Sequence, residues 1–144
     1  MIYTEKPENF DPRFTIVSCY VESDGEILLL HRPPHKPQGN TWGVPAGKLE
    51  TGETIAVAML RELKQETGII LSYDALTYLE LVSVRYEDYD FLYHMYRVQF
   101  DIRPEVVINP EEHTAYEWVS PTKAFQKDLI QDLDVCIRRS YELQ

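Results

Sequence analysis

A glycine-rich loop that leads into one well-delimited helix is the feature that most constrains this chain of 144 residues. The helix is predicted to begin near Thr54, which can serve as the N-cap, and to end at Gly68, which can adopt the left-handed conformation that closes a helix. Its buried stripe is predicted from side chains that recur at spacings of three and four residues, namely Ala56, Met59, Leu60, Leu63 and Thr67. A helix with one apolar stripe must pack against another layer.

The same helix carries carboxylates on a neighbouring stripe. Glu62 and Glu66 are four residues apart and therefore stack one turn above the other. Like charges at this spacing are unfavourable by about 0.2–0.5 kcal/mol, and no lysine or arginine lies three or four residues from Glu62. Two interpretations stay open: a solvated acidic face, or a metal site completed by oxygen atoms of the glycine-rich loop, because carboxylates and carbonyls are the ligands that Mg²⁺ and Mn²⁺ prefer.

The rest of the chain is predicted to consist of strands and a final helix. Apolar alternation predicts strands over residues 14–21, 26–30, 42–47, 76–84, 92–102 and 116–119. Asp24-Gly25 favours a hairpin between the first two strands. A final helical region is predicted from Thr122, and more firmly over 128–141. The length and this mixture of elements predict a single layered α/β domain over residues 1–144.

Composition excludes some classes of function. The chain has 14 basic and 24 acidic residues, a net charge of −10, which argues against a nucleic acid polymer as partner. The sequence shows neither a signal peptide nor an apolar run of membrane-spanning length, so we expect no membrane association and a cytoplasmic location. Cys19 and Cys136 lie in apolar segments and are predicted to be buried, reduced thiols.

Residues 47–69 resemble the signature of the Nudix hydrolases, Gly-x5-Glu-x7-Arg-Glu-U-x-Glu-Glu-x-Gly-U, in which U is a bulky aliphatic residue. The matching positions are Gly47, Glu53, Arg61, Glu62, Leu63, Glu66, Gly68 and Ile69. Gln65 stands where the pattern has a glutamate. The resemblance implies an α/β/α sandwich around a mixed β-sheet, and hydrolysis of a nucleoside diphosphate linked to another moiety with Mg²⁺ or Mn²⁺ as cofactor.

The resemblance also implies roles for the residues of the signature. Glu66 would be the principal metal ligand, assisted by a backbone carbonyl near Ala46 or Gly47. Glu62 would be a further ligand or the base that activates water. Arg61 and Glu53 would pair with each other and hold the loop on the helix, which is structural support.

Residues near the signature add further candidates. Gln65 can still offer an amide oxygen to a metal, but the site loses one negative charge, so we expect weaker metal affinity or one fewer ion. Some family members use a loop glutamate shortly before a Glu-Trp strand as ligand or base, and Glu112 fits that place. Glu111 is a second candidate for the same role, and both glutamates could instead belong to a merely solvated acidic loop. His113 is a further candidate base.

Substrate contacts are predicted in two loops and at one strand end. Residues 31–40 form the most basic block of the chain, in which Arg32 and Lys36 are candidates for phosphate contact, although such a loop can also be merely solvated. Tyr86 and Tyr116 are candidates for stacking on a base.

The sequence therefore predicts a metal-dependent pyrophosphohydrolase. It would hydrolyse a diphosphate linkage in a nucleoside triphosphate or another nucleoside diphosphate derivative, by attack of water at phosphorus. The alternative is a nucleotide-sensing module of the same fold with weak or no catalysis, which Gln65 favours. Exposed strand edges could pair two copies into a homodimer.

Overall fold

The first long strand, β2 (Pro12–Ser23), sends apolar side chains to both faces of a sheet. In the computed structural model, which describes residues 1–143, Val17, Cys19 and Val21 join one core, whereas Ile16 and Tyr20 join the other. The next strand, β3 (Glu26–His31), alternates in the same way and is fully buried over 27–30. A strand that is apolar on both faces belongs to the centre of a covered sheet.

Eight strands form this sheet. The other strands are β1 (Ile2–Tyr3), β4 (Trp42–Gly43), β5 (Ala46–Lys48), β6 (Thr77–Arg85), β7 (Asp90–Phe100) and β8 (Ala115–Val119). The order is β1-β6-β7-β2-β3-β4, with β5 paired to β2 and β8 paired to β3. The pairing of β2 with β7 is parallel, and the other pairings between these eight strands are antiparallel. The sheet is therefore mixed.

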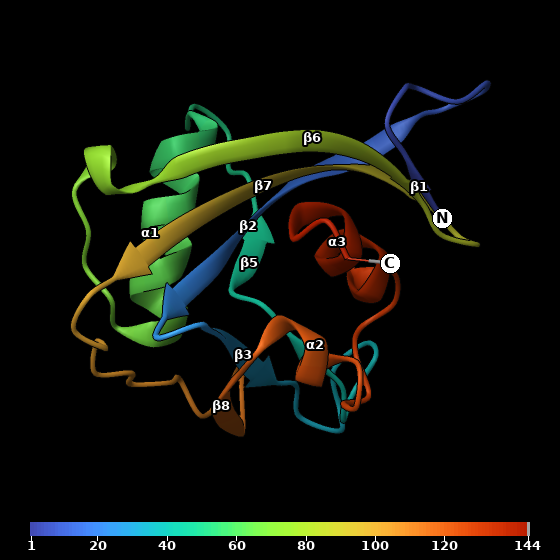
Figure 1. Cartoon of the computed structure of the whole chain (residues 1–144). Coiled ribbons are helices and arrows are strands. Elements are labelled where there is room, and N and C mark those ends of the chain that lie inside the picture. The colour runs from blue at the N-terminus through green and yellow to red at the C-terminus, as the bar shows by residue number, and fades with distance from the viewer. Residues whose placement is uncertain (144) are drawn as a thin grey trace.

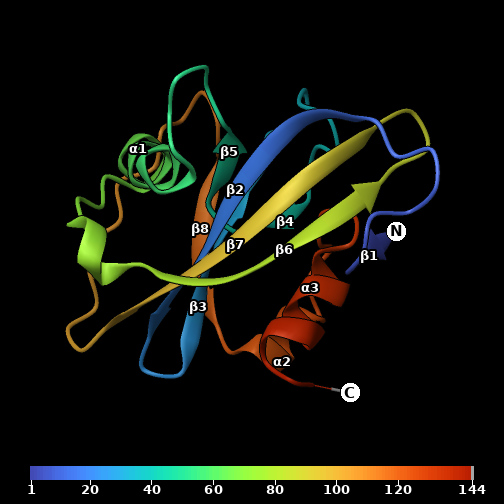
Figure 2. The same cartoon turned by 90° about the horizontal axis from the view of Figure 1, so that it is seen from above.

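Helices cover the two faces of the sheet. Helix α1 (Ile55–Thr67) lies against one face, and α3 (Leu133–Ser140) lies with the short α2 (Pro121–Ala124) on the other (Figures 1 and 2). A short 3₁₀ turn, η1 (Tyr73–Ala75), precedes β6. The predicted α/β/α sandwich around a mixed sheet is confirmed.

Helix α1 has the ends that its sequence predicts. The Oγ1 atom of Thr54 accepts a hydrogen bond from the backbone N–H of Val57 at 3.2 Å. Gly68 takes a left-handed conformation with φ of 73°, and its N–H donates to the carbonyl of Lys64. Such a conformation is strained for residues with a Cβ, so Gly68 ends the helix at this point.

The predicted helix over 128–141 is wrong in its first turn. Residues 128–130 are extended and bind Trp42: its N–H donates to the carbonyl of Asp128 at 2.8 Å, and its carbonyl accepts from the N–H of Ile130 at 2.9 Å. The helix begins only at Leu133 because these backbone groups are engaged by β4. The predicted strand over 42–47 is likewise divided into β4 and β5 at Pro45, whose carbonyl accepts from the N–H of Cys19.

Three smaller expectations concern surface and core. Cys19 and Cys136 are buried free thiols, as predicted. No helix within residues 1–143 is long and apolar enough to cross a membrane. β1 pairs with β6 only at Ser83 and Val84, which leaves the rest of β6 at an edge of the sheet where Leu81 is exposed. A homodimer through such an edge stays a prediction.

Candidate active site

The last turn of α1 directs one carboxylate into the protein. Glu66 is 7% exposed, and its Oε1 atom accepts a hydrogen bond from the backbone N–H of Ala46 at 2.8 Å. Burial raises the pKa of Glu66 well above its usual range, the Ala46 N–H opposes this, and the nearby Glu62 and Glu112 add to the rise. A buried carboxylate among other carboxylates is a strong acceptor for a cation.

Glu62 lies one turn earlier, against β5. A Cβ atom built at Gly47 would lie 2.1 Å from Cδ of Glu62, so this carboxylate occupies the space that any other residue at position 47 would fill. Burial raises the pKa of Glu62, although Arg61 lowers it in part. The glycine at position 47 thus permits the close approach of the loop and this carboxylate.

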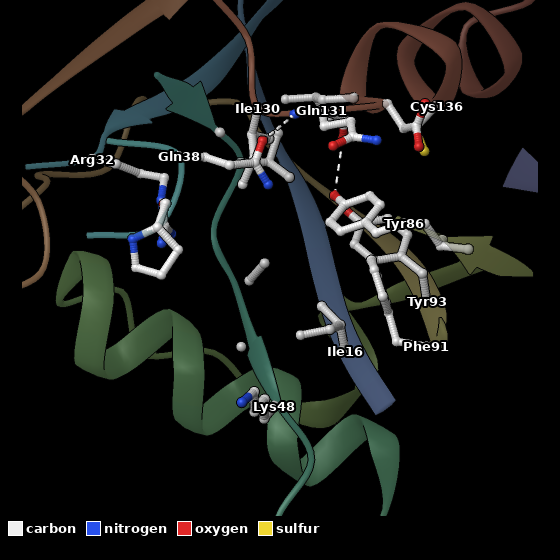
Figure 3. A pocket seen from close by; sticks show the side chains of 18 of the residues that line it. Ile16, Arg32, Gln38, Lys48, Tyr86, Phe91, Tyr93, Ile130, Gln131 and Cys136 are labelled. Carbon is white, nitrogen blue, oxygen red and sulfur yellow. Dashed lines mark hydrogen bonds between the residues drawn. The ribbon is translucent and has the colours of Figure 1, made fainter. Parts of the chain in front are cut away.

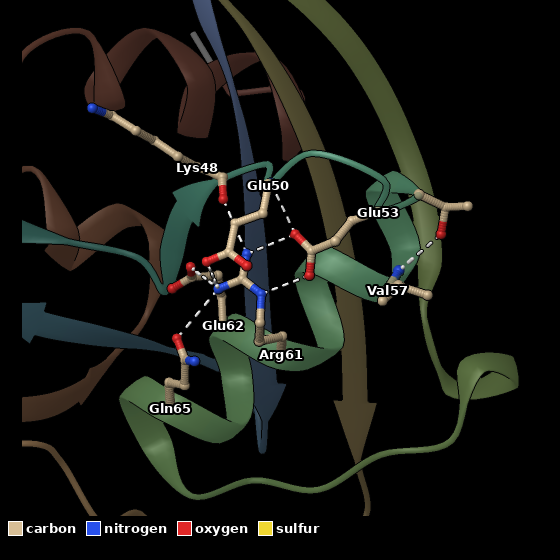
Figure 4. A network of polar contacts seen from close by, with 8 residues as sticks. Lys48, Glu50, Glu53, Val57, Arg61, Glu62 and Gln65 are labelled. Atoms are coloured by element: carbon tan, nitrogen blue, oxygen red, sulfur yellow. Dashed lines mark hydrogen bonds and ion pairs between the residues drawn. The ribbon is translucent and has the colours of Figure 1, made fainter.

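Arg61 connects the loop to the helix (Figure 4). Its Nε and Nη2 atoms donate to the two carboxylate oxygens of Glu53 at 2.7 and 2.9 Å, and Nη2 also donates to the carbonyl of Lys48 at 3.0 Å. Its Nη1 atom donates to Oε1 of Glu62 at 2.6 Å. The positive charge of Arg61 therefore balances the negative charge of Glu62. The two residues are adjacent in sequence, so an examination of residues three or four positions away does not find this ion pair.

Gln65 turns toward the same arginine. Its side chain is exposed, and its Oε1 atom accepts from Nη1 of Arg61 at 3.3 Å (Figure 4). The amide oxygen of Gln65, which was considered as a metal ligand, thus binds Arg61 on the exposed side of the helix.

The segment between β7 and β8 brings a second set of side chains to Glu66. One ligand atom each of Glu66, Glu112 and His113 lie within 4.8 Å of one another. Glu112 is half-buried and His113 is buried, whereas Glu111 is exposed and its N–H binds the Asn109 side chain. Of the two rival glutamates, Glu112 is the one that the fold places beside Glu66.

His113 is unusual within this group. Its Nδ1 atom is buried and has no hydrogen-bond partner among residues 1–143. Burial, together with the charges of Arg32, Lys36 and His31, lowers the pKa of His113 to about 4. The ring is therefore neutral at ordinary pH and has a lone pair available.

A cavity of about 610 Å³ opens beside these groups. Glu66 and His113 line one end, and Arg32 and Lys36 from the basic loop line its wall. The other end is aromatic, with side chains from β2, β7 and the turn before β7, namely Phe14, Tyr86, Tyr89, Phe91 and Tyr93 (Figure 3). Tyr116 is 44% exposed and lies outside the wall that residues 1–143 form, so the structure does not bring it to this cavity.

Two glutamines that line the cavity, Gln38 and Gln131, were not predicted from the sequence. The N–H of Gln131 donates to Oε1 of Gln38 at 2.7 Å, and the carbonyl of Gln131 accepts from the hydroxyl of Tyr86 at 3.1 Å (Figure 3). These contacts join three segments that are far apart in the chain. Because neither glutamine belongs to a motif, no local signal in the sequence identifies them.

The fold, the loop–helix unit and the carboxylate cluster together define a Nudix domain. The family model of the NUDIX domain matches residues 12–140, and the chain belongs to the Nudix family. The expected enzyme class, a Nudix pyrophosphohydrolase, is supported by a relative of similar length. The chain is 31% identical over 116 residues to the CTP pyrophosphohydrolase of Escherichia coli, a match that covers 79% of this chain and 81% of that protein.

Solved structures agree with this assignment. A bifunctional NMN adenylyltransferase/ADP ribose pyrophosphatase from Francisella tularensis, complexed with AMP and a manganese ion, matches with a TM-score of 0.75 and 27% identity, over 93% of this chain and 42% of that one. The NUDIX domain of Shewanella oneidensis NrtR, complexed with ADP ribose, matches with a TM-score of 0.77 and 20% identity, over 96% and 92%. The second likeness shows the fold alone.

Proposed function

We propose that this protein hydrolyses a phosphoanhydride bond of a nucleoside triphosphate or another nucleoside diphosphate derivative, with Mg²⁺ or Mn²⁺ as cofactor. The observation that carries this proposal is the cavity that the buried carboxylate of Glu66 and five aromatic rings line, with Glu112 at ligand spacing from Glu66. Such a cavity matches a ligand with a phosphate chain and a base. The relatives that act on CTP or were crystallised with AMP support the same class of substrate.

The residues present fit a divalent cation. Glu66 and Glu112 would hold it, because Oε1 of Glu66 is fixed by Ala46 and its second oxygen is left to bind. A bound cation would offset the charge of the phosphate oxygens and lower the pKa of a water molecule. We leave Gln65 out of the proposed ligand set, since its oxygen already accepts from Arg61.

Side chains of the protein would activate the water molecule and bind the substrate. Glu62, fixed by Arg61 against Gly47, is the carboxylate that we assign to orienting the water and accepting its proton. The water oxygen bonds to phosphorus, and the bond from that phosphorus to the bridging oxygen breaks. Arg32 and Lys36 would attract the phosphates of the substrate, and the Tyr86 ring would contact the base.

The test is a panel of compounds that includes CTP, the other nucleoside triphosphates and ADP-ribose, each with Mg²⁺ and with Mn²⁺. Products are separated by ion-exchange chromatography, and pyrophosphate is measured as phosphate after coupling to a pyrophosphatase. The Glu66→Ala variant should lose turnover while it keeps the circular dichroism of the wild type. Glu111→Ala is the matched control, because Glu111 is exposed on the same loop as Glu112. Turnover that survives in Glu66→Ala would refute the assignment of this site.

A nucleotide-sensing module is the second candidate, and Gln65 is the observation that favours it, because one negative charge of the family pattern is missing here. The same panel separates the two. Tight binding of a nucleotide by calorimetry, with no turnover of any compound in either metal, would establish the sensor.

A further inference from the structure

His113 presents a buried polar atom for which the protein itself supplies no partner. The residue is 7% exposed, and its Nδ1 atom has no hydrogen-bond partner within residues 1–143. Buried polar atoms are paired in the great majority of cases, and an unpaired one calls for an explanation such as an ion. Hydrogen bonds hold the backbone on which the ring is carried, since the N–H of His113 donates to the Asn109 carbonyl, and Thr114 binds both the carbonyl and the ring of His31.

The surroundings of this ring contain two carboxylates at ligand spacing. One atom each of Glu66, Glu112 and His113 lie within 4.8 Å of one another. Three atoms within 4.8 Å of one another share a centre that is at most about 2.8 Å from each, compared with a metal–ligand bond of about 2.2 Å. A movement of about 0.6 Å or less by each atom would therefore bring all three to one ion.

The position of Gln65 points in the same direction. The family pattern has a carboxylate at this place, whereas here a neutral amide turns outward to Arg61. The cluster at Glu66 thus lacks one carboxylate on its helix side and has an imidazole on its loop side.

We propose that His113 is a nitrogen ligand of the divalent-metal site and that it makes this site select Mn²⁺ or Co²⁺ over Mg²⁺. The inference rests on the proposed function, because it takes the metal to lie at Glu66 and Glu112. Mg²⁺ binds oxygen ligands and gives up water reluctantly, whereas imidazole suits transition metals. A site of two carboxylates and one imidazole therefore differs in selectivity from a site of carboxylates alone.

Pulsed electron paramagnetic resonance of the Mn²⁺-loaded protein tests the bond directly and without reference to activity. We expect a nitrogen coupling in the wild type that changes to the ¹⁵N pattern when only histidine is labelled with ¹⁵N. The coupling should be absent from His113→Asn and present in the control His94→Asn, whose ring lies on β7 and binds the Tyr78 hydroxyl. The labelled wild type gives the answer even where His113→Asn does not fold.

Calorimetric titration of the same proteins with the metals alone gives the selectivity. His113→Asn should bind Mn²⁺ at least about tenfold more weakly than the wild type does, by analogy with the loss of outer-shell ligands, whereas its Mg²⁺ affinity should change much less. Mn²⁺ that binds without a histidine coupling would overturn the inference and leave the proposed function in place. A wild type that binds no Mn²⁺ would overturn both.

Discussion

The two ends of the cavity are built in different ways. The acidic end comes mainly from one continuous stretch, residues 46–66, in which a loop, an arginine and two glutamates are held together by hydrogen bonds over short sequence distances. The aromatic end is assembled from β2, the 31–40 loop, the β6–β7 hairpin and the segment before α3. The difference suggests that the chemistry depends on local structure, whereas the choice of substrate depends on how distant segments meet.

A large effect on turnover is expected from removing the proposed base at the acidic end. Glu62→Gln should lower turnover by about 10²–10⁴-fold, because the variant keeps the shape of the side chain but cannot accept a proton. Mn²⁺ affinity, measured by calorimetry, should be nearly retained. If Glu112→Gln instead showed this pattern, and Glu62→Gln lost the metal, the two roles would have to be exchanged.

Gly47→Ala should disrupt the same end without altering any charge. The new Cβ would lie 2.1 Å from Cδ of Glu62, so this carboxylate must leave its place beside Arg61, at a cost of about 1–3 kcal/mol in the free energy of unfolding. Activity should fall with stability. Gly43→Ala is the matched control, since a Cβ there meets only Ile130 at 3.5 Å. Urea denaturation measures the stability of each variant, and initial rates measure its activity. Equal losses of stability and activity in Gly47→Ala and Gly43→Ala would contradict a specific role for Gly47.

Glu66→Gln should abolish turnover yet stabilise the metal-free protein by about 1 kcal/mol at pH 8. Burial raises the pKa of Glu66 above its usual value of 4.5, so the unfolded chain ionises before the folded one. The contribution of Glu66 to the stability of the wild type is thus fully present below about pH 4.5 and is lost as pH rises through the folded pKa. Urea denaturation in the presence of a chelator measures the free energy of unfolding of both proteins. The difference between Glu66→Gln and the wild type should disappear toward pH 4. An advantage that persists there would have another cause.

The smallest effect is expected at the aromatic end. Tyr86→Phe removes the hydrogen bond to the Gln131 carbonyl and keeps the ring, which should cost about 0.5–1.5 kcal/mol in the free energy of unfolding and hold the ring less firmly for the base. KM should rise several-fold while kcat stays nearly constant, in contrast to every change at the acidic end. A drop in kcat with unchanged KM would show that the two ends are not independent.

The same contrast explains how much of the protein could be predicted from its sequence. Helix α1, its Thr54 cap, its Gly68 end and the β2–β3 hairpin depend on neighbouring residues, and each was predicted correctly. The burial of Glu66 and the proximity of Glu112 follow once the family pattern is in register. The contact of Trp42 with residues 128–130 depends on segments more than 80 residues apart, and no local preference of those segments distinguishes this extended backbone from a helix.

The candidate substrate-binding residues also differ in how far they could be identified from local sequence. Arg32 and Lys36 could be identified because a basic cluster in an acidic chain is visible locally, and both line the cavity. Tyr116 was chosen by the same kind of reasoning as Tyr86, but only Tyr86 faces the cavity, because side chains at neighbouring strand ends point in directions that the register decides. Gln38 and Gln131 become meaningful only when they are seen in contact.

The parallel pairing of β2 with β7 bears on the order in which the molecule assembles. Val17 pairs with His94, and the whole of α1 lies in the crossover between these strands. Pairings between such distant residues form late, whereas a capped helix can form early from local contacts. During synthesis, a chain interrupted before residue 128 would already contain the carboxylates but lack the last wall of its pocket. Completion of the enzyme therefore waits for its C-terminal segment to emerge and join Trp42.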